Sequence, residues 1–231
     1  MSMAGFLFAV IQAAATRDEE WVLFFQPSER DTRVLTHDPI KALIAPRPIG
    51  WVSTMNRQGQ VNLAPYSFFN MLSTEPPLVA FCSEGAKDSA TFARETGEFV
   101  WNMATWDLRE KMNLSSAPLP RGDSEFAHAG LATARSEIVR APRVAESPAA
   151  LECRVCDIHE LRDASGAATR RFLTIGEIVM VHVDDRYVRE GMIHVTEMRP
   201  LARCGYQDYT VLDSVFAMKR PLGAGNIASG G

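Results

Sequence analysis

The chain has little excess charge of either sign. Of its 231 residues, 24 are Lys or Arg and 28 are Asp or Glu, which gives a formal net charge of −4. A protein that binds nucleic acid usually carries a basic face, and the pairs Arg170-Arg171 and Lys219-Arg220 are too short to form one. We therefore expect no nucleic-acid partner.

Cysteine and histidine are also scarce. The four cysteines do not have the spacing of a secreted disulfide framework, so we expect reduced thiols in a cytoplasmic protein. Cys153 and Cys156 form a C-x-x-C motif in a segment typical of a strand, where residues three apart point to opposite faces. The two thiols should therefore diverge, which argues against a dithiol or a metal-binding pair. The five histidines are scattered, without an H-x-x-x-H motif. We expect no metal site.

The common phosphate-binding and nucleophile motifs are missing. No strand is followed by G-x-G-x-x-G, no G-x-x-x-x-G-K-[ST] occurs, and strands do not alternate regularly with helices. No G-x-S-x-G elbow supports Ser-His-Asp catalysis. A nucleotide-like ligand must therefore be held by another kind of site.

The apolar run Gly5–Ala15 is too short to span a bilayer, and no Lys or Arg precedes it as in a signal peptide. We expect no membrane partner. Residues 1–25 are predicted to form a helical arm that packs on the body or on a partner subunit. The Gly-rich residues 222–231 are predicted to form a flexible tail.

Most of the remaining pattern is typical of β-structure. Strands are predicted over Pro48–Met55, Gln60–Ala64, Pro77–Cys82, Phe99–Met103, Leu151–Leu161 and Phe172–Val183. Short helices are predicted over Asp88–Thr96 and Asp107–Ser115. The proline-rich segment Pro118–Pro148 is expected to be a lid or an arm around a partner. This order predicts a mainly β protein, an antiparallel barrel or sandwich with short flanking helices.

The strands Pro48–Met55 and Gln60–Ala64 are expected to form a hairpin around the turn Asn56–Gly59. A polar and aromatic segment follows this first hairpin. Pro65 is expected to end the regular strand pairing and free backbone N–H groups for a ligand. The side chains on offer are Asn62, Ser67, Phe68, Phe69 and Asn70. An apolar slot with a few fixed donors suits a flavin or a similar ring. A core turn with two packed aromatic residues explains this segment about equally well.

A candidate anion site lies at the start of the predicted helix Asp88–Thr96. Lys87, the hydroxyls of Ser89 and Thr91, and the positive end of the helix dipole favour a phosphate there. Asp88 or Ser89 is expected to cap the helix, and a negative cap would compete with phosphate. The alternative is a capped helix with a solvated lysine.

Two hydroxyls, those of Ser53 and Thr54, end the first strand of the hairpin. They can donate to a phosphate or to a carbonyl of a heterocycle. The alternative is that Ser and Thr simply favour the surface of a strand.

Together these segments resemble a known family. The matching motifs are Pro46–Thr54, Asn62–Phe69, Pro76-Pro77, Lys87–Ser89, Gly97–Asn102 and Pro200–Tyr209. They are similar to the flavin reductase-like family, in particular to its branch of flavoredoxins and nitrilotriacetate monooxygenase component B. The resemblance extends over residues 25–221.

The resemblance implies a homodimeric Greek-key split β-barrel over residues 26–221, with FMN near the subunit interface. Hydride transfer from NAD(P)H to flavin N5 would need no catalytic side chain, because the flavin carries the chemistry. The implied FMN-binding residues are Arg47, Ser53, Thr54, Asn62, Ala64, Ser67, Phe68, Phe69, Asn70, Lys87, Ser89 and Thr91.

One departure affects the activity. Reductases of this family carry Gly-Asp-His before a late strand, and that histidine is linked to nicotinamide. Here Arg171 stands in its place. The leading hypothesis is an NAD(P)H:flavin reductase that supplies reduced FMN to a flavin-dependent monooxygenase or another acceptor. The alternatives are an FMN-containing electron carrier and a non-catalytic barrel that binds a small ligand.

Overall fold

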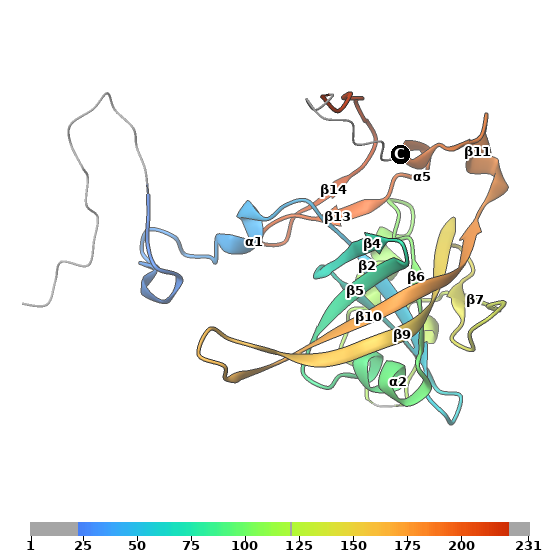
Figure 1. Cartoon of the computed structure of the whole chain (residues 1–231), viewed down its shortest axis with the longest axis horizontal. Coiled ribbons are helices and arrows are strands. Elements are labelled where there is room, and N and C mark those ends of the chain that lie inside the picture. The colour runs from blue at the N-terminus through green and yellow to red at the C-terminus, as the bar shows by residue number, and fades with distance from the viewer. Residues whose placement is uncertain (1–22, 121, 222–231) are drawn as a thin grey trace, which may run out of the picture.

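The computed structural model describes residues 23–120 and 122–221, and its body is a strongly curled antiparallel sheet (Figure 1). The seven strands lie in the order β3-β2-β6-β9-β10-β5-β4. Their bounds are β2 Gly50–Met55, β3 Val61–Tyr66, β4 Phe69–Thr74, β5 Pro77–Glu84, β6 Glu98–Asn102, β9 Ala149–Arg162 and β10 Ala168–Val183. The predicted mainly β split barrel with short helices is confirmed.

The two edge strands of this sheet, β3 and β4, are neighbours in the chain. Only Ser67 and Phe68 separate them, so the sheet has to curl until its edges approach. The amide of Cys82 on β5 donates to the Phe68 carbonyl at 2.8 Å, which ties this corner to the barrel. The barrel is therefore split beside β3, whose outer edge pairs with no other strand among the described residues.

The predicted hairpin is confirmed, because β2 and β3 pair in antiparallel register from Gly50 with Tyr66 to Met55 with Val61. The expectation that Pro65 ends the pairing is wrong, since Pro65 lies opposite Trp51 within β3. The amide of Leu63 points away from β2, toward Glu125. Pro65 is two residues further along the same side, so its missing N–H costs no bond between the strands.

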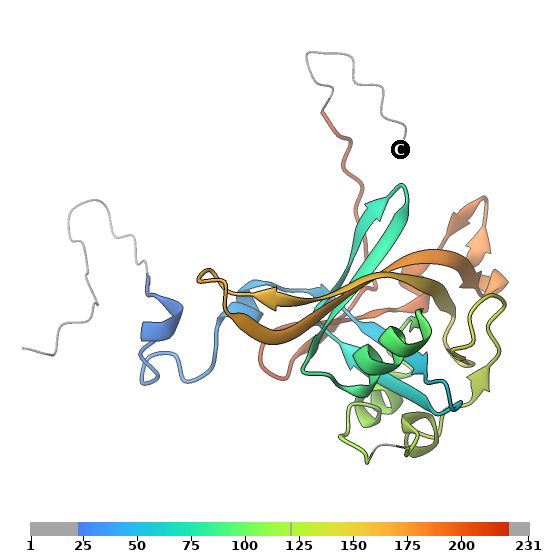
Figure 2. The same cartoon turned by 60° about the horizontal axis from the view of Figure 1, so that its bottom comes forward.

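Helix α2, Asp88–Thr96, has the predicted bounds and closes one end of the barrel (Figure 2). Its buried Ala90, Phe92 and Ala93 face the sheet, and Gly97 ends it in a left-handed conformation with φ of 74°. The predicted cap is wrong. Lys87 occupies the N-cap position and makes no side-chain capping bond.

The core has two main parts on opposite faces of the sheet. Val52, Phe81 and Phe99 fill the barrel, with Val79 and Cys153. Trp51 and Leu63 face the other way and pack under helices α3, Arg109–Leu114, and α4, Glu125–His128. These buried faces supply most of the driving force for folding.

The proline-rich segment that was expected to be a lid or an arm packs on this chain's own sheet. Phe126, Val139 and Val144 are buried, and strands β7, Thr133–Ala134, and β8, Arg143–Val144, pair with each other. The expectation was therefore wrong, because the apolar residues between the prolines cover the outer face of β2 and β3.

Strands from the first and the last quarter of the chain pair in a second, smaller sheet beside the barrel (Figure 1). Its strands are β1 Arg47–Pro48, β13 Leu201–Arg203 and β14 Tyr209–Val211. The other short elements are the helices η1 Pro27–Glu29, α1 Ile40–Leu43, η2 Asp185–Tyr187 and α5 Val195–Met198, and the strand pair β11 Val188–Arg189 with β12 Met192–Ile193.

The segment before β1 extends away from the barrel, as does the far end of the β9–β10 hairpin (Figure 1). The predicted helical arm lies outside the described residues except for 23–25, which are not helical, and the predicted tail lies wholly outside them. Within residues 23–120 and 122–221, no helix is long and apolar enough to cross a membrane.

Candidate functional site

A buried polar cluster joins strand β3 to the first turn of helix α2. The Asn62 amide nitrogen donates to Ser89 Oγ at 2.7 Å and lies 3.5 Å from Thr54 Oγ1. Thr54 is fully buried, and Asn62 and Ser89 are 6% and 1% exposed. Asn62 and Thr54 are cross-strand partners, which brings their side chains together inside the barrel.

Tyr66, on the same strand, extends the cluster. Burial raises the pKa of Tyr66, opposed by hydrogen bonds with Ser89 and Ser83, while the negative charges of Glu125 and Asp88 raise it further. The phenol is therefore neutral at physiological pH and acts as a hydrogen-bonding group. The cluster holds the start of α2 at a fixed position against the open edge of the barrel.

The outward face of this helix start carries the candidate anion site. Lys87 is exposed, and the first amide with a partner inside the helix is that of Thr91, which donates to the Lys87 carbonyl at 2.9 Å. Thr91 Oγ1 donates to the Ala86 carbonyl at 3.1 Å. The Ser89 hydroxyl is turned inward to Asn62. A phosphate here would meet Lys87 and the first-turn N–H groups.

The two aromatic residues of the β3–β4 corner have different surroundings. Phe68 is 52% exposed, whereas Phe69 stacks on Trp101 with ring centroids 5.9 Å apart. Phe69 also fills the space beside Gly50, where a Cβ would lie 2.7 Å from its ring. Phe68 is thus the ring free to contact a ligand.

The remaining residues of this strand and corner have less distinctive contacts. Ala64 lies opposite Val52 and is partly exposed, as is Ser67. Asn70 is exposed, and its side-chain oxygen accepts from the Met71 amide at 2.9 Å. The bond from Cys82 to Phe68 places this corner beside the end of β5, which leads directly to Lys87. The predicted ring slot and phosphate site therefore share one end of the barrel.

Two predicted residues lie apart from this group. Ser53 points to the opposite face from Thr54, where its Oγ donates to the Pro142 carbonyl at 2.5 Å and accepts from Asn102 at 3.1 Å. Arg47 lies in the small sheet, where its guanidinium donates to main-chain carbonyls rather than facing Lys87. A side-chain contact from either residue to a ligand at the start of α2 would require rearrangement.

Glu125 is a neighbour of the site that the sequence did not reveal. Its Oε2 accepts from the Leu63 amide at 3.1 Å, at the open edge of β3. Burial raises the pKa of Glu125, backbone hydrogen bonds oppose the shift, and the charge of Asp88 adds to it. The contact joins residues 62 positions apart, and no local motif signals it.

Arg171 is engaged by a neighbouring acid. Its Nη2 lies 2.9 Å from Glu84 Oε1, and the two residues are register partners on β10 and β5. Burial raises the pKa of the Cys82 thiol, and the charge of Arg171 partly offsets that shift. Arg171 is thus next to the β5 end of the candidate site, paired with a carboxylate.

All four cysteines are free thiols, and Cys153 is buried while Cys156 is exposed. Burial raises the pKa of the Cys153 thiol, which makes it unreactive. Among the residues that the structure describes, no three His, Cys, Asp or Glu side chains form a group able to hold a metal ion.

Comparison with known proteins agrees with this geometry. Residues 43–201 match the family described as flavin reductase like domain. The chain belongs to the flavin reductase-like family. An uncharacterised protein of Halalkalibacterium halodurans is 37% identical over 183 residues, which cover 77% of this chain and 87% of that protein. YwrF of Bacillus subtilis, also uncharacterised, is 33% identical over 85% of this chain and 96% of its own length.

Solved structures give the same assignment. Nitrilotriacetate monooxygenase component B of Bacillus cereus is 28% identical, with a TM-score of 0.79 over 87% of this chain and all of that one (100%). The 2-nitrobenzoate 2-nitroreductase of Pseudomonas fluorescens is 26% identical, with a TM-score of 0.74 over 88% of this chain and 100% of its own. The predicted branch is thereby confirmed, and the family supports a flavin-related oxidoreductase.

Proposed function

We propose that this flavin reductase-like protein binds FMN and uses NAD(P)H to reduce it, supplying reduced flavin to a flavin-dependent monooxygenase or another electron acceptor. The observation that carries the proposal is the Asn62–Ser89 hydrogen bond of 2.7 Å. It seats the uncapped start of α2, with Lys87, beside the open edge of β3. Family membership supports the same ligand class.

The donor set fits a flavin phosphate. Lys87 supplies a cation, and the first turn of α2 supplies N–H groups that no side chain of the N-cap residue satisfies. The exposed Phe68 ring and the polar groups of Ser67 and Asn70 would adjoin the flavin ring. Bound FMN would supply the redox chemistry, so the residues of this chain bind and orient it.

The proposal includes a homodimer. Apolar side chains are exposed on β4, on the segment before β1 and on the segment after β14, and a monomer rarely leaves so much apolar surface in water. They include Leu43, Ile44, Met71, Leu72, Val215, Phe216 and Met218. A cytoplasmic location is also proposed, supported by four free thiols. Light scattering that gave a monomer at micromolar concentration would contradict the dimer.

An FMN-containing electron carrier is the second candidate. It is favoured by the pairing of Arg171 with Glu84. Arg171 occupies the position at which reductases of this family carry the histidine that is linked to nicotinamide. A bound flavin that neither NADH nor NADPH reduces would select this candidate over the reductase.

Two measurements test the proposal. The absorption spectrum of the purified protein, with and without added FMN, shows whether flavin binds. Steady-state oxidation of NADH and NADPH in the presence of free FMN shows whether the protein is a reductase. A protein that stays colourless and leaves the spectrum of added FMN unchanged contradicts both flavin functions.

A further inference from the structure

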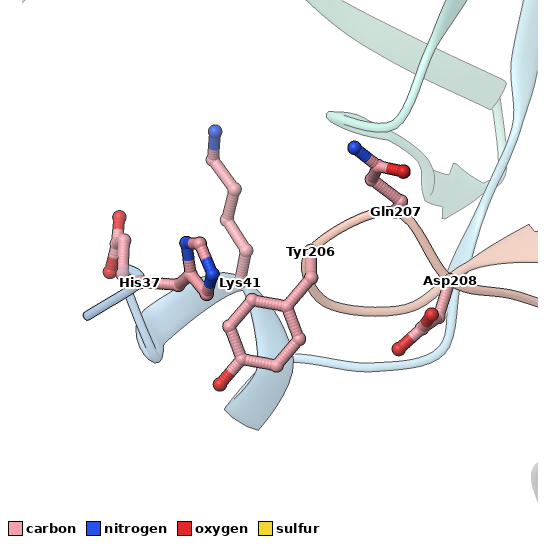
Figure 3. A pocket seen from close by; sticks show the side chains of 6 residues that line it. His37, Lys41, Tyr206, Gln207 and Asp208 are labelled. Carbon is pink, nitrogen blue, oxygen red and sulfur yellow. The ribbon is translucent and has the colours of Figure 1, made fainter. Parts of the chain in front are cut away.

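A pocket lies between helix α1 and the turn that joins β13 to β14 (Figure 3). Its volume is about 550 Å³, enough for a mononucleotide-sized ligand. It is lined by His37, Asp38, Lys41, Tyr206, Gln207 and Asp208. None of these residues belongs to the cluster of Asn62, Ser89 and Lys87 described above.

The two walls of this pocket are held together by Arg47. Its Nη1 donates to the carbonyls of Lys41, at 2.5 Å, and of Ile44, and its Nη2 donates to the Cys204 carbonyl at 2.8 Å. Arg47 is only 8% exposed. Gly205 adds a close approach, because a Cβ there would lie 2.4 Å from the Ala42 Cβ. The separation of the walls is therefore built into the fold.

Two aromatic rings line the pocket. The rings of His37 and Tyr206 meet edge to face, with centroids 5.6 Å apart and an interplanar angle of 60°. Tyr206 has a left-handed backbone with φ of 55°, and it is 49% exposed. A ring presented in this way offers a stacking surface to a planar ligand.

The basic side chain that lines the pocket is Lys41. Within residues 23–120 and 122–221, Lys41 forms no ion pair. Lys41 and Gln207 extend to the same side of the turn, whereas the Asp208 carboxylate points to the other side (Figure 3). Asp38 Oδ1 accepts from the Ile40 amide at 3.0 Å, so the main chain engages one of its oxygens. A cation and an amide donor therefore remain for an anionic ligand.

We propose that this pocket is a second ligand site, which binds a planar aromatic anion with its ring on Tyr206 and its negative group on Lys41. Aromatic carboxylates and nucleoside phosphates share that chemistry. The site uses none of the candidate flavin-binding side chains except Arg47, which positions its walls. The proposed ligand site therefore does not depend on whether the protein reduces flavin.

The test is calorimetric titration of the full-length protein with two matched pairs: benzoate and benzamide, and 5′-AMP and adenosine. We expect at least one anion to bind, at least tenfold more tightly than its neutral partner. Binding of benzoate alone identifies the carboxylate class, and binding of 5′-AMP alone identifies the nucleotide class. If neither anion binds, the proposal is overturned.

Variants locate the site. Lys41→Met should lower the affinity for the anion at least tenfold. Lys219→Met, which removes another exposed lysine, should leave that affinity unchanged. Tyr206→Asn should also weaken it, because Asn tolerates the left-handed backbone but removes the ring, whereas Tyr206→Phe should not. Full affinity for the anion in Lys41→Met, or binding of inorganic phosphate as tight as that of the aromatic anion, would each overturn the proposal.

Discussion

The Asn62 amide donates to the Ser89 hydroxyl at 2.7 Å, and this bond couples the open edge of the barrel to the start of helix α2. Both side chains are buried, so the bond is not exchanged with water. The sequence predicts that Ser89 is a helix cap or a phosphate donor. Its hydroxyl instead supports the position of the helix from within, and Lys87 and the main chain face outward.

The double-mutant cycle of Asn62→Ala and Ser89→Ala should reveal this coupling. Each single change leaves the other polar group buried without its partner and should lower the free energy of unfolding by about 1–3 kcal/mol. The double change should cost clearly less than the sum. Urea unfolding measures all three variants. Additive effects would show that the bond is not an energetic link, and Asn62→Ala with Ser136→Ala, buried in another part of the fold, provides the additive control.

Lys87→Ala should weaken FMN binding by about 1–3 kcal/mol, the typical contribution of a hydrogen bond to a charged group. Riboflavin lacks the phosphate, so its weaker affinity should be nearly the same in both proteins. Fluorescence quenching of the flavin measures both ligands, and Lys219→Ala is the matched control. Unchanged FMN affinity would remove Lys87 from the site.

Glu152 should stabilise the fold in a way that acid removes. Although burial alone would raise the pKa of this carboxyl, the N–H groups of Glu137, Val139 and Ile138, together with His182, lower it to about 2 from an ordinary 4.5. The folded pKa lies below the unfolded one. The stabilisation is therefore complete above pH 4.5 and is lost as the pH falls toward 2.

Glu152→Gln tests this expectation. At neutral pH it should lower the free energy of unfolding by about 2–3 kcal/mol, because one amide oxygen cannot satisfy all the buried donors. The difference from wild type should shrink as the pH falls from about 5 to 2. Glu177→Gln, on an exposed position of β10, should show neither effect. A pH-independent loss would mean that the ionised form of Glu152 has no special role.

Glu125→Gln should have the opposite pH dependence. Burial raises the pKa of Glu125 above its unfolded value, so folding favours the protonated carboxyl. The favourable contribution is present below the unfolded pKa and is lost as the pH rises through the folded pKa. The variant should therefore gain stability relative to wild type as the pH rises, measured by thermal unfolding. Glu110→Gln, an exposed glutamate of α3, should track wild type.

Predictions from the sequence were accurate where a structure depends on local signals, and they failed where it depends on contacts between residues distant in the chain. The helix Asp88–Thr96 was predicted at its observed bounds, because its apolar spacing and Gly97 are local signals. The first hairpin and the two long strands that form β9 and β10 were predicted for the same reason. Strand β4 was missed, since its pattern Phe69–Thr74 is exposed and gains its structure from pairing with β5.

The error at Pro65 has a related origin. A proline ends pairing only where its amide would face a neighbouring strand, and the sequence does not say that β3 is at an edge. The interpretation of Pro118–Pro148 failed likewise, because its apolar residues are recognisable but the face they cover is not.

By itself the sequence determined the class of fold, the family and the cluster of residues that follows the first hairpin, because each is written in local periodicity and short motifs. Only the tertiary structure decided which of those side chains are available. The hydroxyls of Ser53 and Ser89 are engaged in buried hydrogen bonds, and Arg47 holds the walls of the pocket beside α1. Glu125, which lies 62 positions from Leu63 in the sequence, contacts the edge of β3. The physical reason is that the orientation and burial of a polar group depend on partners distant in the chain, which the curling of the sheet brings together.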